Sequence, residues 1–405
     1  MKKTTTLLCL FTLLSCAIFA ASDWNQKASL PADARHRAVG CSVGAKCYLG
    51  TGHFNANALV EYDDWWEFDP ATNSWTQKAN VPGGHRYGAL CFATPTNAYV
   101  GLGKTSVSFL SDFYKYNPNT NTWTPIAQFL GLGRSVGTCV YIPTTLKAYM
   151  GLGTTINGAS KDWYEYNSIT DIWTAKADFP PGKRETAAGF EADDRAFVCS
   201  GRDSIDVEQN DLWRYNPNNN TWMQKASLPG PKRHEASAFG LRDDGFVLLG
   251  LDTSYTDLHD VWKYKEGSDT WEQKPDFDGT ARRYMVAFTN SSDTKGYAGT
   301  GTNGINFNDF WEYAEEELSV GENKNKAVVS IYPNPTSDFA NFTIVGGNNN
   351  SKVISLYDAT GRIVKSNSFT SNKVSVNVAD VASGIYYYSI IENKKQVSTG
   401  KLIIK

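Results

Sequence analysis

Hydrophobic and polar positions alternate with a period of two in short segments spread along most of the chain. In the segment Asp-Phe-Tyr-Lys-Tyr, for example, Tyr114 and Tyr116 fall on one side of an extended chain. A period of two predicts a strand with one buried face. The Asn-Pro-Asn-Thr-Asn segment that follows has the composition of a turn, and Trp123 opens the next strand. Two apolar stretches, residues 88–93 and 97–100, precede this pair. The pattern predicts units of four short strands and no helix.

The unit recurs, and its most regular members are a tryptophan and an arginine eleven residues later. The steps from one tryptophan to the next are 51, 48, 50, 49 and 49 residues, and five aspartates stand eleven residues before a tryptophan. Self-similarity at such a period indicates a repeat architecture, and four strands per repeat predict a β-propeller. The tryptophans are Trp24, Trp75, Trp123, Trp173, Trp222 and Trp271. The arginines are Arg35, Arg86, Arg134, Arg184, Arg233 and Arg282, and the aspartates that open the third strands are Asp64, Asp112, Asp162, Asp211, Asp260 and Asp309.

The two ends of the repeat array are incomplete in complementary ways. No aspartate-aromatic strand precedes Trp24, and Val320 stands where a tryptophan would follow Asp309. We therefore expect residues 24–28 to form the outer strand of the last unit and to close a ring of six. Closure would remove the exposed edges of an open array.

Residues 23–314 resemble a six-bladed kelch propeller. The resemblance is carried by the arginine before each inner strand, the glycines after the second strand, such as Gly101 and Gly103, and the paired aromatics of the third. The chain departs from the family in having Gly-x-Gly where the family has a glycine doublet.

The composition changes at both ends of this region. Residues 1–21 combine Lys2 and Lys3 with an apolar run and small residues, which predicts a secretory signal peptide. A lipobox ending at Cys16 is the alternative, and both interpretations imply export. The apolar run is too short for a transmembrane segment. The domains expected are a signal peptide at 1–21, a propeller at 22–314, a charged linker at 315–327 and a second domain at 328–405.

The second domain has no tryptophan, and alternating segments around Gly and Asn turns predict a small β-sandwich of the immunoglobulin-like kind. Its segments at residues 331–336, 354–362, 384–388 and 400–405 resemble the C-terminal sorting domain of the type IX secretion system. The resemblance implies a Gram-negative bacterium, recognition of this tail by the secretion machinery, passage across the outer membrane, and a secreted or cell-surface protein from which the tail is usually removed.

Charge and cysteine content limit the classes of ligand and the kinds of metal or disulfide site that we expect. The 405 residues carry a formal net charge of −3 with both signs interspersed, which argues against a nucleic-acid-binding protein. Beyond the expected signal peptide five cysteines are left, an odd number. Cys41 and Cys47 flank a short turn, and either a disulfide between them or two buried thiols would fit. No cysteine pair has the spacing of a zinc site, and we expect neither metal nor cofactor.

The candidate functional site is the mouth of the central channel, where the loops entering the innermost strands converge. These loops carry the six arginines. Each either braces its own blade through the blade aspartate or points into the pocket, where a guanidinium suits an acidic ligand. The two positions after each arginine vary from blade to blade, as an asymmetric polar site requires: His36 and Arg37, Tyr87 and Gly88, Ser135 and Val136, Glu185 and Thr186, His234 and Glu235, Arg283 and Tyr284.

The expected function is non-catalytic binding of an extracellular glycan or protein at this mouth by a monomeric propeller. A carbohydrate-active enzyme of the sialic-acid mutarotase type is the alternative, with Glu185 or Glu235 as acid/base. A structural or adhesion component of the cell surface is a third possibility. A copper enzyme like galactose oxidase fits poorly, because the five histidines form no ligand cluster in the sequence and that family has seven blades. Asn- and Asp-rich loops such as residues 306–309 suit turns better than calcium.

Overall fold

The computed structural model describes residues 23–55, 59–315, 329–344, 350–358, 362–392 and 395–405. The expected signal peptide and nearly all of the expected linker lie outside these ranges. The chain divides into two compact units, Met1–Glu315 and Glu316–Lys405.

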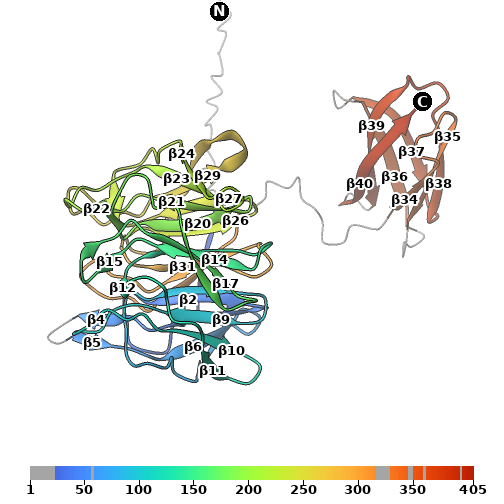
Figure 1. Cartoon of the computed structure of the whole chain (residues 1–405). Helices are drawn as coiled ribbons and strands as arrows, with labels where there is room; N and C mark the ends of the chain where they lie inside the picture. Colours follow the sequence, from blue (N-terminus) through green and yellow to red (C-terminus); the bar gives the residue numbers. More distant parts are fainter. Residues whose placement is uncertain (1–22, 56–58, 316–328, 345–349, 359–361, 393–394) are drawn as a thin grey trace, which may run out of the picture. The chain divides into compact units, whose positions relative to one another are not determined.

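The first unit consists of six four-stranded antiparallel sheets, which we call blades and number along the chain (Figure 1). Blade one is β2 (Val39–Val43), β3 (Lys46–Gly50), β6 (Trp65–Asp69) and β7 (Ser74–Lys78). Blade two is β8 (Leu90–Ala93), β9 (Ala98–Gly101), β10 (Phe113–Asn117) and β11 (Thr122–Pro125). Blade three is β13 (Thr138–Ile142), β14 (Lys147–Gly151), β17 (Trp163–Asn167) and β18 (Ile172–Lys176).

The remaining blades follow the same order of strands. Blade four is β20 (Ala188–Ala192), β21 (Arg195–Cys199), β23 (Leu212–Asn216) and β24 (Thr221–Lys225). Blade five is β26 (Ser237–Leu241), β27 (Asp244–Leu248), β29 (Val261–Lys265) and β30 (Thr270–Lys274). Blade six is β31 (Val286–Thr289), β32 (Gly296–Gly299), β33 (Phe310–Tyr313) and, from the start of the chain, β1 (Trp24–Lys27).

Strand β1 therefore belongs to the same sheet as strands nearly 300 residues away. Trp24 lies opposite Tyr313 and Lys27 opposite Phe310. The Trp24 ring is buried against Phe277 and Tyr313, with ring centroids 4.9 and 5.0 Å away. This pairing covers the edge of β33, which would otherwise expose unpaired backbone groups.

The first strands of the blades contact one another in the cyclic order β2, β8, β13, β20, β26, β31 and back to β2. Their side chains alternate between the cores that separate neighbouring blades and a central channel. The described part of the chain is almost entirely strand, with one short 3-10 helix, η1 (Glu266–Ser268). This is the arrangement of a β-propeller.

The recurring tryptophans join successive blades. Trp123 of blade two donates a hydrogen bond from Nε1 to the carbonyl of Ala79, 2.8 Å away, and packs on Trp65 of blade one. Trp75, Trp173, Trp222 and Trp271 make the same bond to the carbonyl 45–47 residues earlier, at 2.7–2.9 Å. The aromatic excess therefore serves the contacts between blades.

Shorter strands cluster at one end of the channel, where the segment before each first strand pairs with the segment after the second. These pairs are β12 (Arg134–Ser135) with β15 (Thr154–Thr155), β19 (Arg184–Glu185) with β22 (Arg202–Asp203), and β25 (Arg233–His234) with β28 (Leu251–Asp252). Strand β16 (Gly158–Ala159) pairs with β15, and β4 (His53–Asn55) forms a hairpin with β5 (Leu59–Glu61) after the second strand of blade one. We call this end the mouth.

Cys41 and Cys47 are free thiols rather than a disulfide. In the β2–β3 hairpin Cys41 lies opposite Tyr48, while Cys47 lies opposite Ser42. Neighbouring positions on a strand point to opposite faces, so the two side chains enter different cores.

The second unit contains two antiparallel sheets that enclose one hydrophobic core, in which Phe342, Ile354, Tyr388 and Leu402 are buried. One sheet is β34 (Val329–Tyr332), β35 (Phe339–Ile344) and β38 (Lys373–Asn377). The other is β37 (Ile363–Phe369), β36 (Lys352–Tyr357), β39 (Gly384–Glu392) and β40 (Lys395–Ile404).

Candidate functional site at the channel mouth

The six repeat arginines are buried, and each forms a two-pronged ion pair with the aspartate that opens the third strand of its blade. Arg233 is representative: Nη1 and Nη2 each lie 2.6 Å from an oxygen of Asp260. The same guanidinium donates to the carbonyls of Leu249, at 3.0 Å, and Pro231, at 3.1 Å. The other pairs are Arg35 with Asp64, Arg86 with Asp112, Arg134 with Asp162, Arg184 with Asp211 and Arg282 with Asp309.

These contacts use most of the donors of each guanidinium group. Burial by itself disfavours the charged carboxylates, but the hydrogen bonds and positive charge of Arg233 and Arg134 outweigh it and lower the pKa values of Asp260 and Asp162. Of the two roles that the sequence left open for the arginines, all six therefore have the first, which is to brace their own blade. We therefore remove them from the candidate binding site and keep the residues that follow them.

The second residue after each arginine adopts a left-handed backbone conformation, with φ between 49° and 59°. These residues are Arg37, Gly88, Val136, Thr186, Glu235 and Tyr284. Five backbone hydrogen bonds link them in sequence around the channel, each from the N–H of one blade to the carbonyl of the preceding blade, at 2.8–3.1 Å. Only glycine adopts such a φ without strain, so this hydrogen-bonded ring stabilises a costly conformation at five non-glycine positions.

The ring lines a cavity of about 130 Å³ at the centre of the mouth. The left-handed residues of all six blades surround this opening, and all of them except Gly88 contribute a side chain to it. Chemistry at the mouth is therefore set by the residues that occupy the ring and by those beside it.

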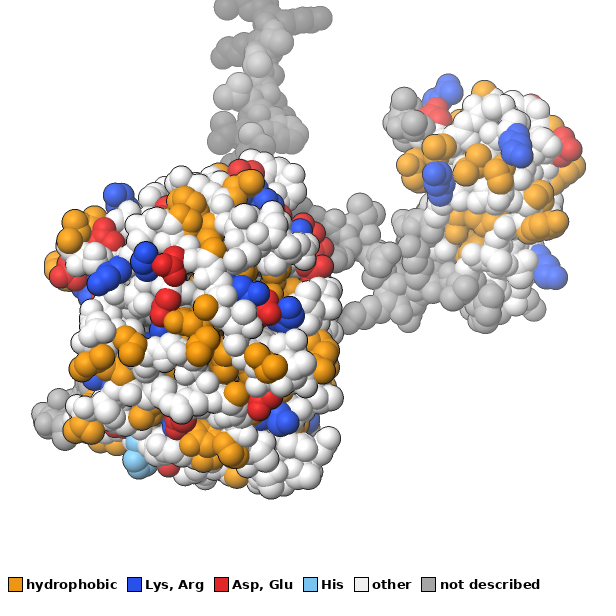
Figure 2. Space-filling model, viewed as in Figure 1, with side chains coloured by type: hydrophobic (Ala, Val, Ile, Leu, Met, Phe, Trp, Pro, Cys, Tyr) orange, Lys and Arg blue, Asp and Glu red, His pale blue; other side chains and the backbone are white. Residues whose placement is uncertain are grey.

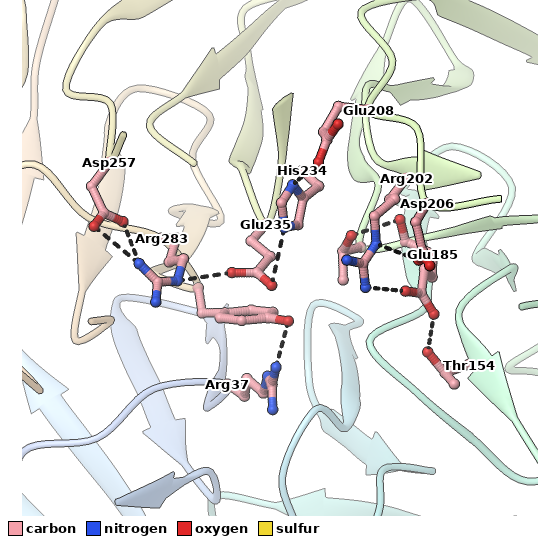
Figure 3. Close-up of polar contacts among 12 residues, drawn as sticks. Arg37, Thr154, Glu185, Arg202, Asp206, Glu208, His234, Glu235, Asp257 and Arg283 are labelled. Atoms are coloured by element: carbon pink, nitrogen blue, oxygen red, sulfur yellow. Dashed lines mark hydrogen bonds and ion pairs between the residues drawn. The ribbon is translucent and has the colours of Figure 1, made fainter. Parts of the chain in front are cut away.

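Arg37 is the distinctive member of the ring. Its Nη2 donates a 2.6 Å hydrogen bond to the Tyr284 hydroxyl, and the guanidinium carbon lies 4.1 Å from the centre of the Tyr284 ring (Figure 3). Its Nε is buried without a hydrogen-bond partner, and no described carboxylate lies within ion-pair distance. Burial opposes the charged form, but Tyr284 and more distant Glu235 outweigh it and raise the pKa of Arg37. A charged guanidinium with unused donors thus faces the opening.

His36 and His53 form a neutral pair beside Arg37. Their Nε2 atoms are 2.7 Å apart, and His36 Nδ1 lies 2.8 Å from the side-chain oxygen of Asn306. The His53 ring stacks on Tyr87 at 4.1 Å. Burial, together with the charge of Arg37, lowers the pKa of His36 to about 4, and burial lowers that of His53 further. Both imidazoles are therefore uncharged near neutral pH.

A charged cluster occupies the blade five side of the mouth. Glu235 lies 3.1 Å from Arg283 Nε and 3.5 Å from His234 Nε2, and Arg283 Nη1 lies 2.8 Å from Asp257 (Figure 3). Glu208 lies 3.5 Å from the other nitrogen of His234. Burial of the imidazole lowers the pKa of His234 despite these carboxylates.

A second carboxylate, Glu185, lies on the opposite side of the opening in Figure 3. It pairs with Arg202 Nη2 at 2.8 Å and accepts a 2.5 Å hydrogen bond from the Thr154 hydroxyl. Arg202 also lies 3.4 Å from Asp206. Glu185 and Glu235 are thus each held by an arginine from a neighbouring loop.

The structure brings to the mouth eight of the residues proposed from the sequence: His36, Arg37, Tyr87, Glu185, His234, Glu235, Arg283 and Tyr284. The sequence did not identify their partners on the loops between second and third strands: His53, Thr154, Arg202, Glu208, Asp257 and Asn306. A signal was available, because each stands one to seven residues after the glycine that follows the second strand of its blade, which is Gly52, Gly153, Gly201, Gly250 or Gly301. Within the described ranges, no group of three or more His, Cys, Asp or Glu side chains is arranged to hold a metal ion.

A larger cavity, of about 630 Å³, opens at the other end of the channel. Its walls include small channel-facing residues such as Cys91 and Cys139, and Glu191, whose pKa burial raises to about 7. We place the candidate site at the smaller opening, because the mouth combines an unpaired guanidinium with aromatic rings and positioned carboxylates.

Comparison with known proteins supports the two parts of the chain separately. Residues 330–405 match the family described as "Secretion system C-terminal sorting domain". The solved structure titled "Structure of YjhT" is similar at a TM-score of 0.59 and 18% identity, covering 70% of this chain and 95% of that one. At that identity the similarity shows the fold alone. No curated protein matches.

The match at the C-terminus confirms the sorting domain expected from the sequence. Across the ranges that the structure describes, no helix is long and apolar enough to span a membrane. The chain thus carries a secretion-system sorting domain behind a propeller-like unit, and the protein is exported to the cell surface or the medium.

Proposed function

We propose that the first unit is a closed six-bladed propeller of the kelch type that binds an extracellular glycan or protein at its mouth without catalysis. The cyclic contacts of the six first strands and the pairing of β1 with β33 support closure. The core shared by the two sheets of the second unit supports an immunoglobulin-like sandwich, which would be recognised by the type IX machinery and removed on export.

The unpaired guanidinium of Arg37 carries the proposal. The other arginines near the opening, Arg202, Arg283 and the six of the braces, are paired with carboxylates, whereas Arg37 has only the neutral Tyr284 hydroxyl. The Arg37 side chain is half-buried and its Nε has no hydrogen-bond partner, so a ligand that completes the bonds of this guanidinium would be favoured. The bidentate geometry of a guanidinium favours a carboxylate or a similar oxyanion.

The surroundings of Arg37 suit a saccharide that carries such a group. Tyr87 and Tyr284 place half-buried aromatic rings beside Arg37, and Glu185, Glu235 and the neutral histidines could accept from or donate to the hydroxyl groups of a sugar. An acidic side chain on a protein ligand would meet the same guanidinium. The proposed ligand is therefore a carboxylate-bearing glycan or an acidic protein segment.

The test is to screen the purified protein on an array of neutral and acidic glycans and to measure affinity for the best binder by calorimetry. Replacing Arg37 with Gln should weaken binding about tenfold to a hundredfold, because a hydrogen bond to a charged group contributes about 1.5–3 kcal/mol. Arg195→Gln is the matched control, since Arg195 lies at the other end of the channel and contacts only backbone carbonyls of Asp193 and Asp194. Equal affinities of the wild type and Arg37→Gln would contradict the proposed site.

The second candidate function is sugar interconversion of the mutarotase type. It is favoured by the two carboxylates, Glu185 and Glu235, held on opposite sides of the opening by Arg202 and Arg283. A carboxyl group so positioned can transfer a proton to or from a sugar oxygen. Anomer exchange of N-acetylneuraminate followed by NMR should accelerate with the protein and slow when Glu235 is replaced by Gln. Exchange at the spontaneous rate would leave binding as the function.

A further inference from the structure

Each loop between the second and third strands of a blade presents a large apolar side chain to solvent. We call the set the apolar crown: Val60, Val107, Ile156, Ile205, Tyr255 and Ile305. Five of them are 74–88% exposed, and Val60 is 44% exposed. Turns normally carry polar residues and glycine, and an exposed side chain at a loop tip contributes nothing to a core. Folding therefore does not explain these six residues.

The exposed apolar residues of the first unit are distributed unevenly. Of the thirteen large apolar side chains that are exposed in its described part, ten lie on the loops at the mouth end, including Leu130 and Leu132 next to the crown. The other three, Ile169, Ile172 and Met223, lie on or beside the outer strands. Single exposed apolar residues are common, but a concentration at one end marks an interaction surface.

Figure 2 shows apolar side chains along the edge of the first unit that carries β4, β5, β15 and β22 in Figure 1. Because the crown residues come from six blades that surround the channel, a small ligand in the mouth cannot contact all of them. The occupant of such a surface is a macromolecule or a membrane.

The charges beside the crown distinguish these occupants. Around Ile205 the loop carries Asp203, Asp206 and Glu208 against Arg202. Around Tyr255 the loop carries Asp252 and Asp257, of which Asp257 pairs with Arg283, so acidic side chains outnumber basic ones in these two loops. An anionic membrane would be repelled by this acidic sector of blades four and five, since membrane-binding loops pair apolar tips with Lys and Arg. A protein with apolar and basic side chains is complementary to it.

We propose that the apolar crown is the docking surface for an extracellular protein whose contact face is apolar, with basic side chains opposite blades four and five. The inference is independent of the ligand held by Arg37, because it rests on different residues. The partner would cover the mouth and add contacts to whatever enters it.

The test places a photo-crosslinking amino acid, benzoylphenylalanine, at position 107, 205 or 305 of the full chain in the bacterium that produces it. We expect all three positions, on separate blades, to capture the same protein, and position 169 to capture none of it. The captured protein is then purified, and its affinity is measured against two variants. The crown variant replaces Val107, Ile156, Ile205, Tyr255 and Ile305 with Ser, and the control variant replaces Ile169, Ile172 and Met223 with Ser.

The crown variant should bind at least tenfold more weakly than the wild type, and the control variant equally well. Replacing Asp206 with Lys should also weaken binding, because this side chain is exposed, and the wild-type affinity should fall as salt rises. The side chains changed in the crown and control variants are all exposed, so both variants should unfold at the wild-type temperature. Different proteins captured at the three positions, lipid adducts, capture of a second copy of the chain, or equal affinities of the crown and control variants would each overturn the proposal.

Discussion

The arginine–aspartate brace makes a quantitative prediction about the stability of the first unit. Replacing Arg233 with Met keeps the aliphatic stem but removes four donated hydrogen bonds, two to Asp260 and two to carbonyls. The Asp260 side chain is 15% exposed and retains a 2.7 Å hydrogen bond from Trp262, so water and this bond compensate in part. Breaking a buried ion pair usually costs about 3–5 kcal/mol, and we expect about 3 kcal/mol here.

The assay is equilibrium and thermal unfolding followed by tryptophan fluorescence, with Arg37→Met as the control. A cost of about 3 kcal/mol corresponds to a fall in Tm of about 6–12 °C for a unit of this size. The control should lose less than about 1 kcal/mol, because Arg37 is only partly buried and has no carboxylate partner that its removal would strand. Replacing Asp260 with Leu in the Arg233→Met background should recover part of the loss. A loss below about 1 kcal/mol in Arg233→Met, or strictly additive losses in the double variant, would refute the brace.

Three further predictions concern the same unit. Replacing the buried Trp24 with Ala should cost about 3–5 kcal/mol and increase proteolysis near residues 310–313, whereas unchanged unfolding would show that β1 is dispensable. The pKa values of Asp260 and Asp162 are lowered in the folded state, so their contribution to stability is complete above about pH 4 and is lost as pH falls below it. An acid titration followed by circular dichroism should therefore show unfolding below about pH 4, and the stability of Asp260→Asn should depend less on pH in that range. Burial raises the pKa values of the Cys47 and Cys199 thiols, so a thiol reagent at pH 8 should label them only after denaturation, and labelling of these two thiols in the native protein at the rate of free cysteine would contradict their burial.

The strands and their order were predictable because each blade repeats the same physical requirements. An interblade tryptophan, a period-two aromatic strand and a glycine-bounded turn recur at intervals near 49 residues, so local ambiguity in one blade is resolved by the others. The incomplete ends pointed to the pairing now seen between β1 and β33. A single blade read alone would not have shown this, since Trp24 and Tyr313 are far apart in the chain.

For the candidate site, the sequence predicted which positions surround the mouth but not how their side chains are paired. The recurring aspartates made a bracing role for the arginines one of two alternatives, but burial, which decides between them, depends on neighbouring blades. The left-handed conformation of Val136 and Thr186 contradicts their intrinsic preference and depends on the backbone hydrogen bonds between blades. The pairing of His36 with His53 also required the loops to be placed in space.

The pairing of β1 with β33 also bears on how the protein is made and delivered. Translation finishes the last strand of blade six just before it reaches the sorting domain at residues 330–405. A chain that ends before β33 therefore lacks both the strand that pairs with β1 and the sorting domain that directs export. We therefore expect a truncated chain with an unpaired sheet edge not to be exported, so that completion of the last sheet and export depend on the same C-terminal segment.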